Sequence, residues 1–240
     1  MVNSTKIHQI SKTMKNTNLL LFVISLLFIS AINQANSKPL HPKHKAAHSA
    51  TVAKASAPKK TDSWQPDPTL ATNLADETQV GSYFIRLPFG YSEIPQPPGI
   101  AAQMPNGFDN HEYGLTRRSD GTSATIALSI ATPPPGMTGS ISLGEVLDGT
   151  LTAKKQQWQN FTESPAQDGE INGLSFKRAY YKGIVSGRAG TRMAHGLVYV
   201  AVDGTKILSY QAEDVEPYNE DTLSVAQASI LTFHRQETKQ

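Results

Sequence analysis

The chain of 240 residues contains no cysteine. This absence excludes disulfide bonds, catalysis by a thiolate, zinc sites built on cysteine and a lipid anchor attached to a cysteine. Exported proteins of eukaryotes often carry disulfides, so a cysteine-free chain with an export signal favours a bacterial source. The composition is otherwise ordinary for a globular protein, with 38% hydrophobic and 18% charged residues.

Several motifs of enzyme chemistry are also missing. The sequence has no G-x-S-x-G nucleophile elbow, no phosphate-binding loop, no dinucleotide fingerprint and no H-E-x-x-H zinc motif. Beyond residue 80 it contains only three histidines, His111, His195 and His234. His195 stands inside an apolar strand pattern, where we expect a hydrogen-bonded, structural histidine. The sequence therefore indicates no cofactor and no catalytic residue.

The positive charge is concentrated at the N-terminal end. The net charge is +2, but nine of the 22 basic residues and only four of the 20 acidic residues precede Val80. The rest of the chain therefore carries more acidic than basic residues. A nucleic-acid-binding domain would carry its positive charge on the folded surface, so this distribution argues against nucleic acid as a partner.

Residues 1–37 have the pattern of a secretory signal peptide. Three lysines and no acidic residue precede an apolar segment of 14 residues, Leu19 to Ile32. Small residues follow, and they predict cleavage after Ser37. The apolar segment is shorter than the roughly 20 residues that a membrane span needs. An uncleaved N-terminal membrane anchor is the alternative to cleavage, and with cleavage the protein would be periplasmic or secreted.

Residues 38–80 are predicted to be a disordered basic linker. Lysine, proline, alanine, serine and threonine dominate this segment, and few side chains could form a core. Its positive charge could make peripheral contact with lipid head groups or with anionic polymers, and a plain solvated spacer is the alternative. The linker histidines His41, His44 and His48 are close in sequence, but a flexible segment holds a metal poorly.

A single globular domain is predicted for residues 81–235, followed by a polar tail at 236–240. Alternating or apolar patterns indicate strands at 83–87, 112–118, 122–132, 161–170, 174–185, 193–202 and 206–211. Asp203-Gly204 and Asn172-Gly173 are typical of hairpin turns.

Two amphipathic helices complete the domain. One begins at Ser142, which forms a capping-box pattern with Glu145, and runs to Trp158. The other follows Pro217 and continues to Phe233. Nearly every strand connection reads as a hairpin. The predicted fold class is therefore α+β, an α/β sandwich with a central, mostly antiparallel sheet of six to seven strands and two covering helices.

The order of elements and several short sequence segments resemble those of the PsbP/Mog-type superfamily. The residues that carry the resemblance are the strand and turn at 84–91, the strand at 199–202 with Gly204, and the helix end at 229–233. The resemblance implies an α/β sandwich with a central antiparallel sheet. No motif of a Ran-contact surface or of a photosystem subunit is visible, so the resemblance implies a fold and no function.

Two groups of residues are candidate sites. Asp109, His111 and Glu112 offer two carboxylates and one imidazole in a predicted loop, where they could bind a divalent ion or form an ordinary polar turn. A second group consists of Arg178, Arg188 and Arg192, which lie near predicted strand ends. These arginines could gather and attract an anion, or they could simply make the sheet surface soluble.

Three functions remain open on the sequence alone. The first is a non-enzymatic exported domain that binds or scaffolds a protein or polymer of the cell envelope or extracellular space. The second is a metal-dependent hydrolase or lyase, with Glu112 as base and His111 as ligand. The third is a carrier of a small ligand, bound between the sheet and the proline-rich loop at 95–105.

Overall fold

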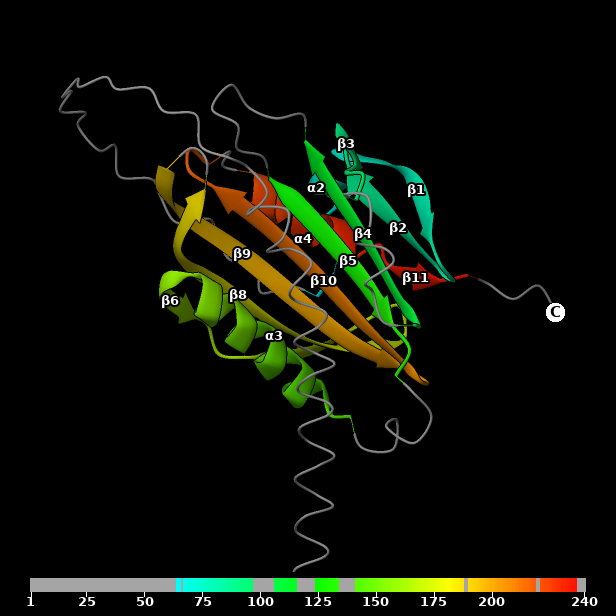
Figure 1. The fold of residues 1–240 in the computed structure, drawn as a ribbon. Coiled ribbons are helices and arrows are strands. Elements are labelled where there is room, and N and C mark those ends of the chain that lie inside the picture. Colours follow the sequence, from blue (N-terminus) through cyan, green and yellow to red (C-terminus); the bar gives the residue numbers. More distant parts are fainter. Residues whose placement is uncertain are drawn as a thin grey trace, which may run out of the picture.

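The protein folds into three layers around a large antiparallel sheet (Figure 1). The computed structural model describes residues 64–65, 67–96, 106–115, 124–133, 141–187, 190–218 and 221–236. The predicted signal peptide, its cleavage position at Ser37, and the linker up to residue 63 lie outside the described residues.

The described residues form three helices and eleven strands. The helices are α2 (Pro68–Ala71), α3 (Leu143–Gln157) and α4 (Thr222–Ile230). The strands are β1 (Leu74–Val80), β2 (Tyr83–Pro88), β3 (Tyr91–Glu93), β4 (Phe108–Leu115), β5 (Thr125–Ala131), β6 (Gln159–Glu163), β7 (Gln167–Ile171), β8 (Leu174–Gly187), β9 (Gly190–Asp203), β10 (Lys206–Val215) and β11 (His234–Arg235).

Eight strands form the large sheet in the order β3-β4-β5-β10-β9-β8-β6, with β7 also paired to β8. All of these pairs are antiparallel. The centre of β9 is buried on both faces from Leu197 to Ala201. A strand covered on both sides needs apolar residues at consecutive positions, which explains why this segment does not alternate.

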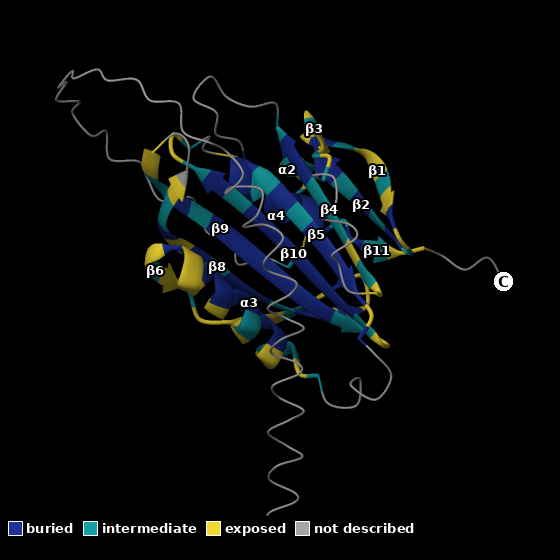
Figure 2. Cartoon of the chain, viewed as in Figure 1, coloured by how far each residue is buried: buried dark blue, intermediate teal, exposed yellow. Residues whose placement is uncertain are grey.

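Helix α3 covers one face of the large sheet. Its first turn is closed by a capping box, in which the Ser142 side chain accepts from the Glu145 N–H and Glu145 accepts from the Ser142 N–H. Leu147 and Leu151 are buried against a group of sheet residues that includes Val198. Figure 2 shows the exposed positions of α3 turned away from the sheet. The apolar stripe of this helix thus packs as its spacing predicts.

Helix α4 and a second sheet of three strands, in the order β1-β2-β11, cover the opposite face. The core on this side is larger and rich in aromatic side chains. It includes Tyr83 and Ile85 of β2, Tyr199 and Tyr210 of the large sheet, and Phe233 after α4. Tyr83 and Phe233 stack with ring centroids 4.9 Å apart.

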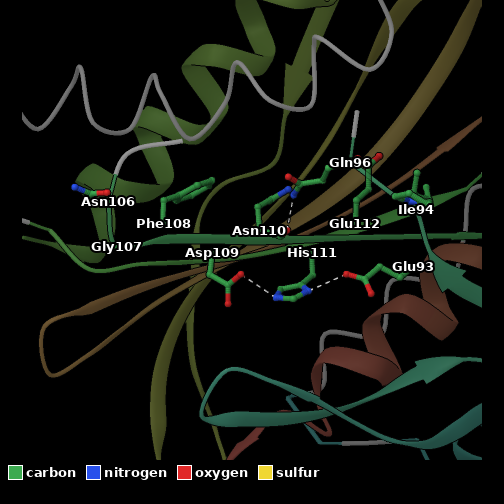
Figure 3. Close-up of a pocket in the computed structure, with 11 residues that line it drawn as sticks. Glu93, Ile94, Gln96, Asn106, Gly107, Phe108, Asp109, Asn110, His111 and Glu112 are labelled. Carbon is green, nitrogen blue, oxygen red and sulfur yellow. Dashed lines mark hydrogen bonds and ion pairs between the residues drawn. The ribbon is translucent and has the colours of Figure 1, made fainter. Parts of the chain in front are cut away.

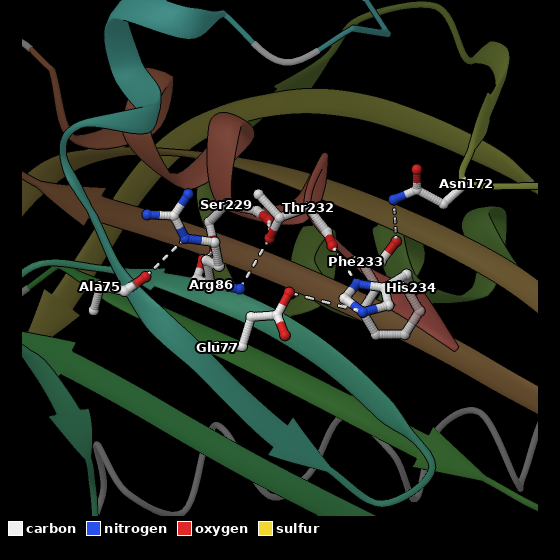
Figure 4. A network of polar contacts seen from close by, with 8 residues as sticks. All are labelled: Ala75, Glu77, Arg86, Asn172, Ser229, Thr232, Phe233 and His234. Carbon is white, nitrogen blue, oxygen red and sulfur yellow. Dashed lines mark hydrogen bonds and ion pairs between the residues drawn. The ribbon is translucent and has the colours of Figure 1, made fainter. Parts of the chain in front are cut away.

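Polar contacts fasten the small sheet to the end of α4 (Figure 4). The Arg86 N–H donates to the Thr232 hydroxyl at 2.9 Å, and the Ser229 hydroxyl donates to the Arg86 carbonyl at 2.6 Å. The Asn172 amide, in the turn between β7 and β8, donates to the Phe233 carbonyl at 2.8 Å. These bonds satisfy backbone groups that burial would otherwise leave without partners.

The predicted fold class is confirmed. An antiparallel sheet forms the centre, α3 and α4 cover its two faces, and both predicted hairpin turns are present. Gly204, Asn172 and Gly173 adopt the positive φ angles that such turns need. The large sheet has eight strands, more than the six to seven expected, because the predicted strand at 161–170 consists of the two strands β6 and β7 and because β3 was not predicted. The predicted strand at 83–87 is β2, which belongs to the small sheet.

Ordered structure begins earlier than position 81, the predicted start of the domain. Helix α2 and β1 lie within the segment that was assigned to the disordered linker. Leu74 and Val80 are almost fully buried, and β1 pairs with β2. The polar residues between Leu74 and Val80 hid this edge strand, since only its two ends supply apolar side chains to the core.

Two element boundaries also differ from the prediction. Strand β4 begins at Phe108, so Asp109 and His111 lie within the same strand as Glu112 and not in a loop before it. Helix α4 begins at Thr222, several residues after Pro217. In both places polar residues and proline suggested a loop or a helix start, whereas backbone pairing and burial determine the element.

Candidate functional site

The described residues form an open groove of about 460 Å³ at the edge of the large sheet (Figure 3). It lies where β3 ends and the first half of β4 continues. Its lining comes from these two strands and from the segments beside them: Glu93, Ile94, Pro95, Gln96, Asn106, Gly107, Phe108, Asp109, Asn110, His111 and Glu112.

The groove exists because β3 pairs with β4 over only three residues. Glu93 is the last residue of β3 and lies opposite Tyr113. The Ile94 N–H still donates to the Glu112 carbonyl at 2.7 Å. Pro95 then ends the ladder because proline has no N–H, and the Gln96 side-chain amide donates to the Asn110 carbonyl at 2.7 Å. The Gln96 side chain thus takes the place of a backbone donor at Asn110.

One wall of the groove is a histidine between two carboxylates, which we call the His111 cluster (Glu93, Asp109 and His111). The Nδ1 of His111 lies 3.1 Å from Glu93 Oε1, and its Nε2 lies 3.0 Å from Asp109 Oδ1. Only the Nδ1 contact has the angles of a hydrogen bond, so the Nε2 contact is electrostatic. The His111 side chain is 26% exposed, whereas Glu93 and Asp109 are 62% and 54% exposed.

The His111 cluster rests on a buried tyrosine. The rings of His111 and Tyr113 stack with centroids 6.3 Å apart. Burial, with smaller contributions from the negative charges of Glu93 and Asp109, raises the pKa of Tyr113 to about 12. The phenol therefore stays neutral, and it acts as an apolar support for the imidazole.

The second wall of the groove carries amides and one carboxylate. Asn110 and Glu112 point from β4 to the side opposite the His111 cluster, because successive side chains of a strand alternate (Figure 3). The Ser129 hydroxyl donates to Asn110 Oδ1 at 2.6 Å, which fixes the Asn110 amide. The groove thus offers acceptors and carboxylates on both sides of one exposed strand edge.

The predicted set of Asp109, His111 and Glu112 is not brought together. Glu112 lies on the other side of β4, and Glu93 takes its place beside His111. No group of three or more His, Cys, Asp or Glu within the described ranges has the arrangement of a metal site. Sequence reasoning missed Glu93 because Tyr91 to Glu93 stands in a proline-rich context that reads as a loop. Only the pairing of β3 with β4 reveals the contact.

Two members of the predicted arginine group, Arg178 and Arg192, are not brought together either. Arg178 lies on β8 opposite Tyr199 and is completely buried, whereas Arg192 lies opposite Val185 near the other end of the same strand pair. Seven residues along a strand separate the two by roughly 23 Å. Arg192 donates to the Glu216 carbonyl at 2.8 Å. Arg188 lies outside the described residues.

His195 lies in β9, as expected, but its hydrogen bonding is incomplete. Its ring stacks on Tyr218 with centroids 3.9 Å apart, and its Nε2 is buried with no hydrogen-bond partner. Burial lowers the pKa of His195 below its ordinary value, against the opposing influence of Asp214 and Glu216. The expectation of a satisfied sheet histidine was therefore wrong for Nε2.

Within the described ranges, no helix combines the length and the hydropathy that a membrane span requires. No family model matches the chain, and no curated protein sequence matches it. Similarity appears only among solved structures.

The cyanobacterial PsbP (CyanoP) of Synechocystis sp. PCC 6803 is 14% identical with a TM-score of 0.47, over 67% of this chain and 91% of its own. The Ran-binding protein Mog1p of Saccharomyces cerevisiae is 12% identical with a TM-score of 0.42, over 68% and 95%. LpqN of Mycobacterium tuberculosis, involved in cell envelope biogenesis, is 18% identical with a TM-score of 0.40, over 65% and 87%.

The TM-scores of all three structures are below 0.5. The comparison includes one PsbP protein and one Mog protein, the two names that the sequence resemblance implies. At these identities the likeness does not extend to partners or to chemistry.

Proposed function

We propose that the protein is an exported binding domain, and that the groove at the β3–β4 edge holds a cationic, polar ligand, such as a basic segment of an envelope or extracellular protein or polymer. The observation that supports this proposal is the lining of the groove. Glu93 and Asp109 place two carboxylates against the His111 imidazole, and Glu112 adds a third on the other side of β4. The proposed export rests on the sequence of residues 1–37.

The geometry of His111 favours binding over turnover. A histidine that acts as a general base has one ring nitrogen oriented by a partner and the other directed at the substrate. In the His111 cluster, carboxylates lie at 3.0 and 3.1 Å from the two ring nitrogens. Neither nitrogen is directed at open space, so the cluster resembles an ion-pair network.

The exposure of the carboxylates favours a ligand with positive charge. Glu93 and Asp109 are more than half exposed, so a lysine or arginine side chain can reach them without opening the fold. A guanidinium or ammonium group would add charge-assisted hydrogen bonds to carboxylate and amide oxygens along the groove. Exposed pairs of this kind contribute little singly, so we expect a ligand with several cationic groups.

A lysine peptide tests the proposal directly. Binding of a short oligolysine to the protein is measured by calorimetry at low salt, for wild type and for a Glu93→Gln/Asp109→Asn variant. The control, Glu163→Gln/Glu170→Gln, removes the same charge from exposed positions on β6 and β7. We expect the groove variant to bind about three- to tenfold more weakly than the control, since each lost pair contributes up to about 1 kcal/mol. Equal affinities of the two variants would refute the proposal.

The volume of the groove supports a second candidate, a carrier of a small polar ligand. Pockets for such ligands have volumes of roughly 300 to 1,000 Å³, and this groove has about 460 Å³. Ile94 and Phe108 add an apolar floor to the polar walls. A screen of small cationic metabolites by thermal shift, with Asp109→Asn as the control, separates this function from the binding of a polymer.

A further inference from the structure

Trp64, at the start of the described chain, is seated on the large sheet far from the groove. Its indole packs against Tyr199 of β9, edge to face with centroids 5.5 Å apart, and the Arg178 guanidinium lies 4.3 Å from the indole centroid. Arg178 is on β8, four strand positions from β4, or roughly 19 Å across the sheet. We call this position the Trp64 seat (Gly169, Arg178 and Tyr199).

A missing side chain makes room for the indole. Gly169 lies on β7, and a Cβ atom built at this position would come within 2.0 Å of the Trp64 ring. The indole therefore packs directly on the glycine backbone. A glycine inside a strand often marks a place where another group must approach closely, and an aromatic ring over such a glycine restores the burial that it lacks.

The floor and walls of the seat are held by the fold and do not depend on Trp64. The Arg178 Nε donates to Gln167 Oε1 at 2.8 Å, and its Nη1 donates to the Tyr199 hydroxyl at 3.0 Å. The Tyr180 hydroxyl donates to Gln227 Oε1 of α4 at 2.8 Å. A planar cation between fixed aromatic rings is a favourable environment for another flat π system.

The residues after Trp64 are fixed separately. Asp67 caps α2 through the Thr69 N–H at 2.9 Å, and Leu70 packs against a small core that contains Leu74 and Val225. These contacts of Asp67 and Leu70 hold α2 and β1 on the domain whether or not Trp64 occupies the seat. Trp64 precedes α2 in the sequence and packs on other residues than Leu70 does, so we infer that it can leave the seat while α2 and the small sheet stay in place.

We propose that the Trp64 seat is a recognition site for a planar aromatic ring of the indole type, which Trp64 occupies in cis. A partner that presents an exposed tryptophan would bind there in exchange for Trp64. This site is independent of the groove and of the function proposed for it. When Trp64 fills the seat most of the time, the apparent affinity for an external ligand equals the intrinsic affinity multiplied by the fraction of molecules in which the seat is empty.

Removal of the cis occupant tests the proposal. Binding of N-acetyltryptophanamide to the full chain is followed by ligand-observed NMR. We expect Trp64→Ala to bind at least about tenfold more tightly than wild type, because its seat is always empty. Adding Gly169→Ala to this variant should abolish the gain, since the new methyl group occupies the indole plane. The matched control, Trp64→Ala/Glu170→Ala, changes an exposed neighbour on β7 and should keep the gain.

The possible results are decisive. If Trp64→Ala shows no gain over wild type, or if the Gly169→Ala and Glu170→Ala combinations bind alike, the Trp64 seat is not a recognition site.

A second measurement does not need the Trp64→Ala variant. The chain has only two tryptophans, and Trp158 is buried in the other core, so a Trp158→Phe variant reports on Trp64 alone. We expect acrylamide to quench Trp64 several-fold less than free tryptophan. Gly169→Ala should raise quenching toward the free value, and Glu170→Ala should leave it unchanged. If acrylamide quenches Trp64 in the Trp158→Phe variant as strongly as it quenches free tryptophan, the seat is empty and the proposal is overturned.

Discussion

At the scale of single residues, close contacts between aromatic rings and glycines shape the sheet. Tyr181 of β8 lies opposite Gly196 of β9, and a Cβ atom at Gly196 would come within 2.5 Å of the phenol ring. Tyr181 is buried, and its hydroxyl donates to Glu213 at 2.8 Å. The glycine is thus required by its neighbour, and its φ angle is not among the positive ones.

We therefore expect Gly196→Ala to destabilise the fold by about 1 to 3 kcal/mol, because the ring must move within a packed core. Urea denaturation measures this loss. Gly144→Ala, in the first turn of α3, is the matched control, because its new Cβ would meet only the Ser142 hydroxyl at 3.8 Å. That change should be neutral or stabilising by up to about 1 kcal/mol. Equal effects at the two positions would contradict the contact.

His195 makes stability depend on pH. Burial lowers its pKa from an ordinary value of 6.5, while Asp214 and Glu216 oppose the shift, and Lys182 lies opposite on β8. Well above pH 6.5 the ring is neutral in both the folded and the unfolded chain. As the pH decreases below 6.5, the unfolded chain binds the proton before the folded chain does. The free energy of unfolding therefore decreases as the pH decreases.

Between about pH 7 and pH 5, we expect the free energy of unfolding to decrease less for His195→Gln than for wild type. The two decreases should differ by at most about 1.4 kcal/mol for each unit by which the fold lowers the pKa of His195. Urea denaturation at several pH values gives both curves. Parallel curves for the two proteins would show that His195 does not contribute.

The candidate site shows why residue contacts are hard to predict. His111, Asp109 and Glu112 are adjacent in sequence, but alternation along β4 separates Glu112 from the other two. Glu93 is 18 residues away from His111 and lies beside it only because β3 pairs with β4. Once a strand is known, the sequence pattern predicts on which face of the sheet each side chain lies. It does not predict which residue of the neighbouring strand lies beside that side chain.

At the scale of elements, one buried ion pair joins α3 to the sheet. Lys154 of α3 forms a salt bridge with Glu213 of β10, and their side chains are only 5% and 17% exposed. Glu213 also accepts the Tyr181 hydroxyl. A charge left alone in such a position is costly, whereas removal of both charges is tolerated better.

We expect Lys154→Met to cost about 3 kcal/mol of stability, and Lys154→Met/Glu213→Gln to recover at least about 1 kcal/mol of this loss. A double-mutant cycle with thermal or urea denaturation measures both values. A double variant less stable than Lys154→Met would contradict the role of the pair.

The longest elements were predictable from the sequence, and the shortest strands were not. Strands β8, β9 and β10 and helix α3 have ten or more residues, and their apolar patterns and turn residues identify them. Strands β3 and β11 have three and two residues, and they exist only because a neighbouring strand offers hydrogen bonds. Edge strands of this kind carry little local signal, and the groove depends on one of them.

At the scale of the whole molecule, the small sheet and α4 complete the core. A chain that begins at residue 81 would lack β1 and with it Leu74 and Val80, which are almost fully buried. Burying two such side chains contributes about 3 to 6 kcal/mol. Loss of this amount is large against the 5 to 15 kcal/mol that stabilise a typical domain.

We therefore expect a chain of residues 64–240 to unfold cooperatively at a temperature close to that of a chain of residues 38–240. A chain of residues 81–240 should be strongly destabilised or unfolded. Circular dichroism during thermal unfolding compares the three. Equal stability of the shortest chain would show that β1 is dispensable and that the domain begins at residue 81.

The groove as a contact surface is tested most directly by crosslinking in the native host. A photoreactive amino acid is placed at Asn106, in the groove, or at Gln156, on the exposed side of α3. After irradiation of intact cells, we expect one defined adduct from position 106 that oligolysine competes away, and none from position 156. Adducts of equal yield from both positions, or none from position 106, would contradict the groove as the binding surface.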